Sequence, residues 1–122
     1  MYDKELALEI LSRIYQATQT VLKRFEPIKS ADDFTDSDTG REKLDAICMQ
    51  LIAIGEGLKN LDKITDHNLL PRYPEIDWKK VKGMRDIITH HYFDLDAEAI
   101  YEVCKNHMDV LAQTLDKMMK EI

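Results

Sequence analysis

The sequence predicts an all-α protein that folds as a single domain over residues 1–122. Hydrophobic residues make up 44% of the chain and charged residues 33%, with 4 glycines and 3 prolines. This composition suits long amphipathic helices better than a turn-rich β architecture. Apolar residues also recur at steps of three and four, as they do on the buried face of a helix. A chain of this length can bury one core without disulfides or metal ions.

Two long helices are expected in the first half of the chain. Residues 3–26 have apolar side chains at helical spacing, and Pro27 ends this helix. A second helix is expected from about Arg41 to Ile64, and its apolar face consists of Leu44, Ile47, Leu51, Ile54, Leu58 and Leu61. Residues 29–40 are rich in Ser, Asp and Thr, which predicts a loop with one short helical turn. Phe34 could dock this loop onto the bundle.

Two glycines interrupt the second helix. Gly55 and Gly57 weaken a helix unless a neighbouring helix or a ligand needs a close approach at that point. Glu56 between them could be functional, although an exposed acid is the commoner explanation.

The second half is expected to contain two more helices after a connector at residues 67–75. Asp77 can cap a helix that begins at Trp78, and Trp78, Val81, Ile88 and Tyr92 share one face of it. Arg85 lies on the same face and therefore needs a partner, a ligand or an interface, because an unpaired buried guanidinium is very costly. Asp96 is a plausible N-cap for a last amphipathic helix that reaches Ile122.

The net charge of the protein limits how it can bind nucleic acid. The net charge of -6 argues against broad attraction to a polyanion, so any RNA contact must be local. Residues 71–91 are the exception, with five basic and three acidic residues.

The chain shows no sign of export or of a metal centre. Three of residues 1–5 are charged, and the longest uncharged stretch, residues 46–55, is 10 residues long. We therefore expect a cytoplasmic protein without a membrane segment. Cys48 and Cys104 stand singly within predicted helices, so they should be buried, inert thiols. No metal site or cofactor is expected, because His67 and His107 have no partner at metal-ligand spacing.

The chemically richest segment is Arg85 to Tyr92, with the sequence RDIITHHY. Histidine can give or take a proton near neutral pH, and the forked donors of arginine can stabilise charge on a phosphate. Residues five apart lie about 140° apart on a regular helix, so Arg85 and His90 would point in different directions. Either the helix unwinds near His90 or a second chain completes the site. Cleavage through the 2′-hydroxyl needs both a base and an acid, which one histidine per chain supplies poorly and a two-fold dimer supplies better.

The pattern R-x-x-x-x-H-x-Y, formed by Arg85, His90 and Tyr92, resembles the signature of the HEPN superfamily, and especially of its HepT-like toxins. The likeness extends over nearly the whole chain, including Ile54-Gly55-Glu56, Trp78 and the residues around Phe93. The resemblance implies an up-and-down bundle of four to five helices. It also implies a homodimer whose two motifs face each other across a cleft and cleave RNA without a metal ion.

In that family a minimal nucleotidyltransferase antitoxin neutralises the toxin by attaching AMP to the motif tyrosine, here Tyr92. The resemblance gives Arg85 the role of holding the phosphate and His90 that of general acid or base, with Asp86 and Tyr92 in support. Asp86 departs from the family, which usually has Asn there; an Asp could orient His90, while its charge would oppose a phosphate. The alternative is a non-catalytic HEPN partner that binds a nucleotide or a nucleotidyltransferase subunit.

Overall fold

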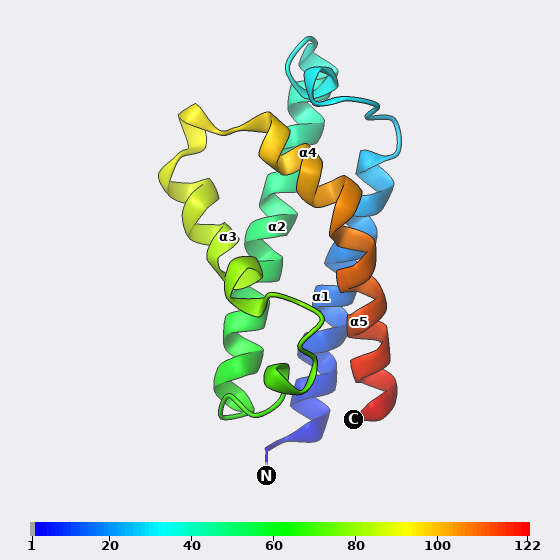
Figure 1. The fold of residues 1–122 in the computed structure, drawn as a ribbon, viewed down its shortest axis with the longest axis vertical. Helices are drawn as coiled ribbons and strands as arrows, with labels where there is room; N and C mark the ends of the chain where they lie inside the picture. Colours follow the sequence, from blue (N-terminus) through cyan, green and yellow to red (C-terminus); the bar gives the residue numbers. More distant parts are fainter. Residues whose placement is uncertain (1) are drawn as a thin grey trace.

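The computed structural model describes residues 2–122, which form α-helices and short 3₁₀ turns and contain no strand. The helices are α1 (Lys4–Phe25), α2 (Asp38–Ile64), α3 (Trp78–His90), α4 (Ala97–Asn106) and α5 (Met108–Glu121), and the 3₁₀ turns are η1 (Ala31–Phe34), η2 (Leu70–Arg72) and η3 (Tyr92–Asp94). In Figure 1, α1, α2 and α5 run along the long axis, α3 lies beside α2, and α4 crosses near one end. The predicted all-α bundle of four to five helices is confirmed.

Four of the helices begin where a side chain accepts a hydrogen bond from a backbone N–H of the first turn. These caps are Asp3, Ser37, Asp77 and Asp96. The predicted caps of α3 and α4 are therefore confirmed. The cap at Ser37 accepts from the Gly40 N–H at 3.0 Å, so α2 begins three residues earlier than Arg41, where the sequence pattern placed its start.

The last helix differs from the prediction, because the expected single helix is divided at His107. The backbone of His107 leaves the helical conformation, with φ -124° and ψ -23°. The division lets α4 lie against η1 while α5 runs along α1, as Figure 1 shows. A straight helix could not follow both paths, and the apolar spacing continues across the break without marking it.

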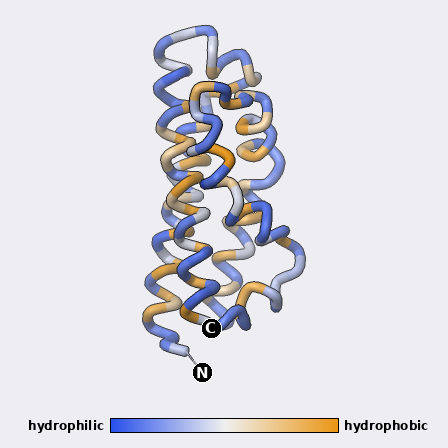
Figure 2. Tube along the Cα trace, turned by 90° about the vertical axis from the view of Figure 1, so that its left-hand side faces the viewer, coloured by the Kyte–Doolittle hydropathy of each residue, from blue (hydrophilic) through white to orange (hydrophobic). Residues whose placement is uncertain are grey.

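The core is built from the apolar faces that the sequence pattern identified. Figure 2 shows hydrophobic and hydrophilic positions alternating along the helices. Phe34 is fully buried and docks the loop between α1 and α2 onto the bundle, as expected. Cys48 and Cys104 are also buried, and desolvation raises the pKa of each thiol to about 12, so the expected inert thiols are confirmed. Among residues 2–122 no helix is long and apolar enough to cross a membrane.

The two glycines of α2 lie where neighbouring helices come closest. A Cβ at Gly55 would be 3.3 Å from the backbone oxygen of Lys82 and 3.4 Å from the Cβ of Arg85, both on α3. A Cβ at Gly57 would be 2.7 Å from Cγ1 of Ile14 on α1. The predicted close approach is confirmed at both positions, and at Gly55 it determines how near α3 stands to α2.

Gly55→Leu should therefore destabilise the fold, because its side-chain atoms beyond Cβ would press into the backbone of α3. We expect a loss of about 1–3 kcal/mol in the free energy of unfolding, measured by urea denaturation. Ala53→Leu is the matched control, since Ala53 is exposed on the same helix. Equal stabilities of the two variants would contradict the close packing at Gly55.

Candidate functional site

Arg85 lies on the side of α3 that faces α2, and its guanidinium is held by two carboxylates. Its Nε is 2.8 Å from Oε1 of Glu56 on α2, and its Nη1 donates a hydrogen bond of 3.1 Å to Oδ1 of Asp86. The side chain of Arg85 is 43% exposed, so it stands at the surface rather than in the core. The partner that the sequence analysis required for Arg85 is thus present, and part of the guanidinium remains open to a ligand.

Glu56 and Lys59 extend this group along α2. The Nζ of Lys59 is 3.8 Å from Oδ2 of Asp86. The hydrogen bond from Arg85 and the charge of Lys59 hold the pKa of Asp86 below its ordinary value. From the sequence, Glu56 was expected to be an exposed acid or a functional residue; it is half exposed and pairs with Arg85, whereas Lys59 was not identified. Their spacing of three residues, which places both on one face of α2, was the available signal.

His90 is the last residue of α3 and is exposed to solvent. The helix is regular up to this residue, so it does not unwind to bring His90 and Arg85 onto one side. Asp86 hydrogen-bonds Arg85, and no hydrogen bond joins it to His90 among the residues that the structure describes. One chain therefore brings Arg85 and Asp86 together and leaves His90 four residues further on, near enough for its charge to act on Asp86 but without a hydrogen bond to it.

Tyr92 follows the end of α3, in η3, and is 51% exposed. The prediction that it shares the buried face of Trp78 and Ile88 is wrong, because the helix ends before it. Its hydroxyl donates a hydrogen bond of 3.3 Å to Oδ1 of Asp45 on α2. The charge of Asp45 and this hydrogen bond raise the pKa of Tyr92 above its ordinary value. Asp45 was not expected from the sequence to be a partner of Tyr92.

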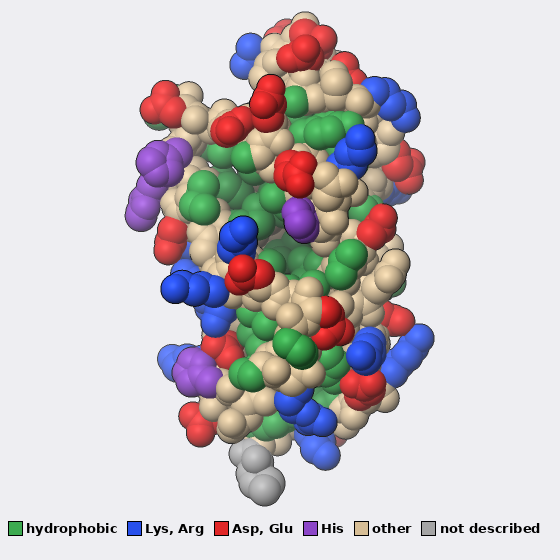
Figure 3. Space-filling view, viewed as in Figure 1, with side chains coloured by type: hydrophobic (Ala, Val, Ile, Leu, Met, Phe, Trp, Pro, Cys, Tyr) green, Lys and Arg blue, Asp and Glu red, His purple; other side chains and the backbone are tan. Residues whose placement is uncertain are grey.

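Large apolar side chains are exposed on α2 and around the end of α3. Met49 is 64% exposed, Ile87 58% and Phe93 97%. In Figure 3, histidine side chains project at the edge of the molecule where α3 ends. The surface around His90 thus combines imidazoles with apolar side chains that water does not solvate well.

A second ion-pair group joins α2 to α3 below Arg85. Asp62 is nearly buried, and its Oδ2 accepts hydrogen bonds from Nζ of Lys82 at 2.9 Å and from Nδ1 of His67 at 2.7 Å. Burial alone would raise the pKa of Asp62, but these two hydrogen bonds outweigh it and lower the pKa below its ordinary value. Among residues 2–122, no three His, Cys, Asp or Glu side chains are grouped so that they could hold a metal ion.

The chain matches the family described as Ribonuclease HepT-like over residues 7–118. It therefore belongs to the HepT-like ribonucleases, a family of the HEPN superfamily, and the resemblance noted in the motif is confirmed. The fold and the family together make it a ribonuclease-type helical bundle.

Its relatives carry ribonuclease names. The chain is 30% identical over 103 residues to the Methanocaldococcus jannaschii protein named "Putative RNase MJ0127". The matched region covers 80% of this chain and 82% of the relative. The chain is 30% identical to "Putative RNase TTE0752" of Caldanaerobacter subterraneus, over 92% of this chain and 89% of that one. It is 32% identical to "Probable ribonuclease HepT" of Thermococcus cleftensis, over 62% and 64% of the two chains. No solved structure matches the chain significantly.

Asp62→Asn should reveal the contribution of the second ion-pair group to stability. The pKa of Asp62 is depressed in the folded protein, so its contribution is complete above the ordinary aspartate pKa and is lost as the pH falls through the folded value. We expect the variant to lose about 1–3 kcal/mol at pH 7, and the gap to wild type to narrow under strongly acidic conditions. Unfolding curves at several pH values measure both effects.

Asp66→Asn, an exposed change on the same turn, is the control and should stay close to wild type at every pH. If the difference in free energy of unfolding between wild type and Asp62→Asn stays constant down to the most acidic pH, the charge of the carboxylate is not what stabilises the protein.

Proposed function

We propose that this protein is a metal-independent endoribonuclease that acts as the toxin of a toxin-antitoxin pair. The observation that carries the proposal is the exposed guanidinium of Arg85, fixed between Glu56 and Asp86 on the same helix that ends at His90. The relatives' ribonuclease names support RNA as the substrate.

In this mechanism the 2′-oxygen of the RNA attacks the neighbouring phosphorus while the bond from phosphorus to the 5′-oxygen breaks. The imidazole of one His90 takes the proton of the 2′-hydroxyl, and a second, protonated imidazole gives a proton to the leaving 5′-oxygen. The donors of Arg85 stabilise the negative charge that gathers on the phosphate oxygens in the transition state. Two imidazoles are needed, and a dimer supplies one His90 from each chain.

A homodimer supplies the second imidazole. α3 keeps its helical geometry up to His90, so a single chain leaves this residue about 140° around the helix from Arg85. The exposed side chains of Met49 on α2 and of Ile87 and Phe93 near the end of α3 give apolar area that a second copy can cover. Two-fold pairing through it would place the Arg85 of each copy near the His90 of the other.

The toxin role includes inactivation by a nucleotidyltransferase antitoxin that uses Tyr92. In that reaction the Tyr92 oxygen forms a bond to the α-phosphorus of ATP, the α–β phosphoanhydride bond breaks, and pyrophosphate leaves. The half-exposed phenol is accessible to a second enzyme. Asp45 already accepts the hydrogen bond from the Tyr92 hydroxyl and is therefore placed to take its proton. The bound AMP would add bulk and negative charge beside His90 and so exclude RNA by sterics and repulsion.

His90→Ala should lower the rate of RNA cleavage by at least about 100-fold, because a general acid-base group contributes that much or more. Purified protein is incubated with RNA in EDTA, and the products are separated by electrophoresis. His107→Ala, which removes an exposed histidine from the junction of α4 and α5, should cleave like wild type.

Identical products from wild type and His90→Ala would contradict the catalytic role and favour the non-catalytic partner. The molar mass of the same samples in solution is expected to be that of two chains. Full cleavage by a monomer would contradict the dimeric site.

Tyr92→Phe should abolish AMP addition while leaving RNA cleavage close to wild type, because it removes the acceptor oxygen alone. The protein is incubated with ATP and the partner nucleotidyltransferase, and its mass is measured. Tyr15→Phe, on α1, should still gain one AMP. AMP addition to Tyr92→Phe at the wild-type level would place the modification elsewhere.

A further inference from the structure

Two adjoining hollows lie on the surface beside the Arg85 group, and the proposed mechanism does not use them. The first is shallow and largely open to solvent, with a volume of about 480 Å³, and its lining comes from α2 alone: Glu56, Gly57, Lys59, Asn60 and Lys63. The second, of about 270 Å³, lies between α1 and α2 and is lined mainly by small and branched apolar side chains. They share Gly57 and Asn60, so they form one continuous depression.

We infer that this depression is a nucleotide subsite, which holds the RNA nucleotide next to the one at which the strand is cleaved. This inference rests on the proposed ribonuclease function and names how the substrate strand would lie. The site offers the two kinds of contact that a nucleotide requires: cationic groups for its phosphate and an apolar surface with an amide for its base.

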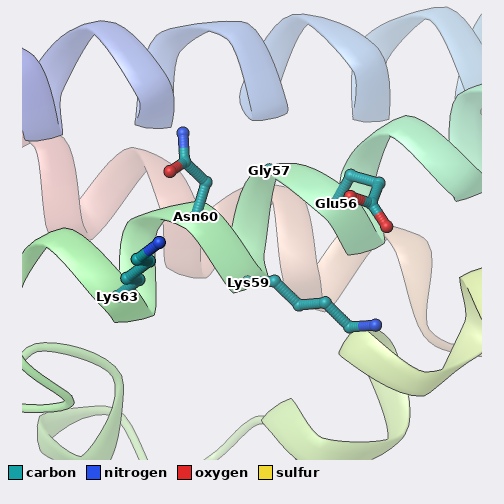
Figure 4. Close-up of a pocket in the computed structure, with 5 residues that line it drawn as sticks. All are labelled: Glu56, Gly57, Lys59, Asn60 and Lys63. Atoms are coloured by element: carbon teal, nitrogen blue, oxygen red, sulfur yellow. The ribbon is translucent and has the colours of Figure 1, made fainter.

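The lysines supply the phosphate contacts. Figure 4 shows Lys59 extending toward α3 and Lys63 one turn further along α2. Lys59 reaches Asp86, while Glu56 lines the depression and also holds Arg85, so the depression adjoins the proposed cleavage site directly. Lys63 is seven residues from Glu56, about 10 Å along the helix axis, where it can meet a neighbouring phosphate.

The apolar floor and Asn60 supply the base contacts. Gly57 has no side chain and packs closely over Ile14, which keeps this floor shallow and open, and Ile10, Ala17 and Ala53 complete its apolar lining. In Figure 4 the amide of Asn60 points toward α1, over this floor. A base lying there would be covered on one face by aliphatic carbons, and its edge would face an amide that both donates and accepts hydrogen bonds.

Charge explains why an acidic protein can hold a polyanion here. Around the depression, four positive charges face three negative ones, which leaves the group at +1, whereas the whole chain carries -6. The positive charges are on Arg13, Lys59, Lys63 and Arg85, and the negative ones on Glu56, Asp86 and Glu9, which pairs with Arg13. The attraction is short in range, because salt screens exposed charges beyond about 8–10 Å. The strand would therefore be held only where it crosses this part of α2.

The test measures binding of end-labelled fluorescent RNA oligonucleotides, otherwise of natural nucleotides, to the His90→Ala protein by fluorescence anisotropy, so that cleavage does not enter the readout. Adding Lys63→Ala should weaken binding and reduce the slope of log affinity against log salt by about 0.7, the value for one phosphate contact on a single strand. Lys23→Ala, an exposed lysine near the end of α1, should leave both unchanged.

Asn60→Ala should leave the salt slope unchanged and reduce the differences in affinity among A, C, G and U homopolymers, because it removes a base contact. Ala53→Leu should weaken binding by filling the floor. Unchanged affinity and slope in Lys63→Ala, or an unchanged base preference in Asn60→Ala, would overturn the subsite. A wild-type protein that binds RNA with these properties but does not cleave it would overturn the proposed function and leave the subsite standing.

Discussion

The site depends on the close contact between α2 and α3 at Gly55. The absence of a side chain there lets the backbone of α3 approach within van der Waals distance of α2. That approach brings Arg85 within reach of Glu56, the residue next to Gly55, and brings Lys82 within reach of Asp62 two turns further on. α3 packs chiefly on α2, so these contacts, together with the hydrogen bond from Tyr92 to Asp45, determine where the end of α3, with His90, is held.

The two ion-pair groups on this contact have different physical characters. Asp62 and Lys82 are mostly buried, so removing either side chain would leave an unpaired buried charge and destabilise the fold. The pair therefore keeps α2 and α3 in register. Glu56, Arg85 and Asp86 are about half exposed and contribute little to stability. Their role is to orient Arg85, because two carboxylates hold its guanidinium in one place while solvent still reaches it.

Asp86 places a carboxylate beside the proposed phosphate site. A carboxylate on Nη1 of Arg85 competes with a phosphate for the same donors, and the phosphate must either displace it or use the remaining N–H groups. The proposed contacts of Lys59 and Lys63 offset this competition, because Lys59 lies 3.8 Å from the Asp86 carboxylate and partly neutralises it, while Lys63 adds positive charge one turn further along α2. Binding would then be local and strongly dependent on salt concentration.

The sequence by itself determined the all-α class, the caps at Asp77 and Asp96, and the segment that contains Arg85, His90 and Tyr92, because helical spacing and capping are local properties. It also indicated a close approach at Gly55 and Gly57. It did not show the break at His107, the partnership of Glu56 with Arg85, or the exposure of Tyr92 beside Asp45. Those features arise from residues far apart in the chain, and only the packing of α2 against α3 and of α4 across η1 brings them together or separates them.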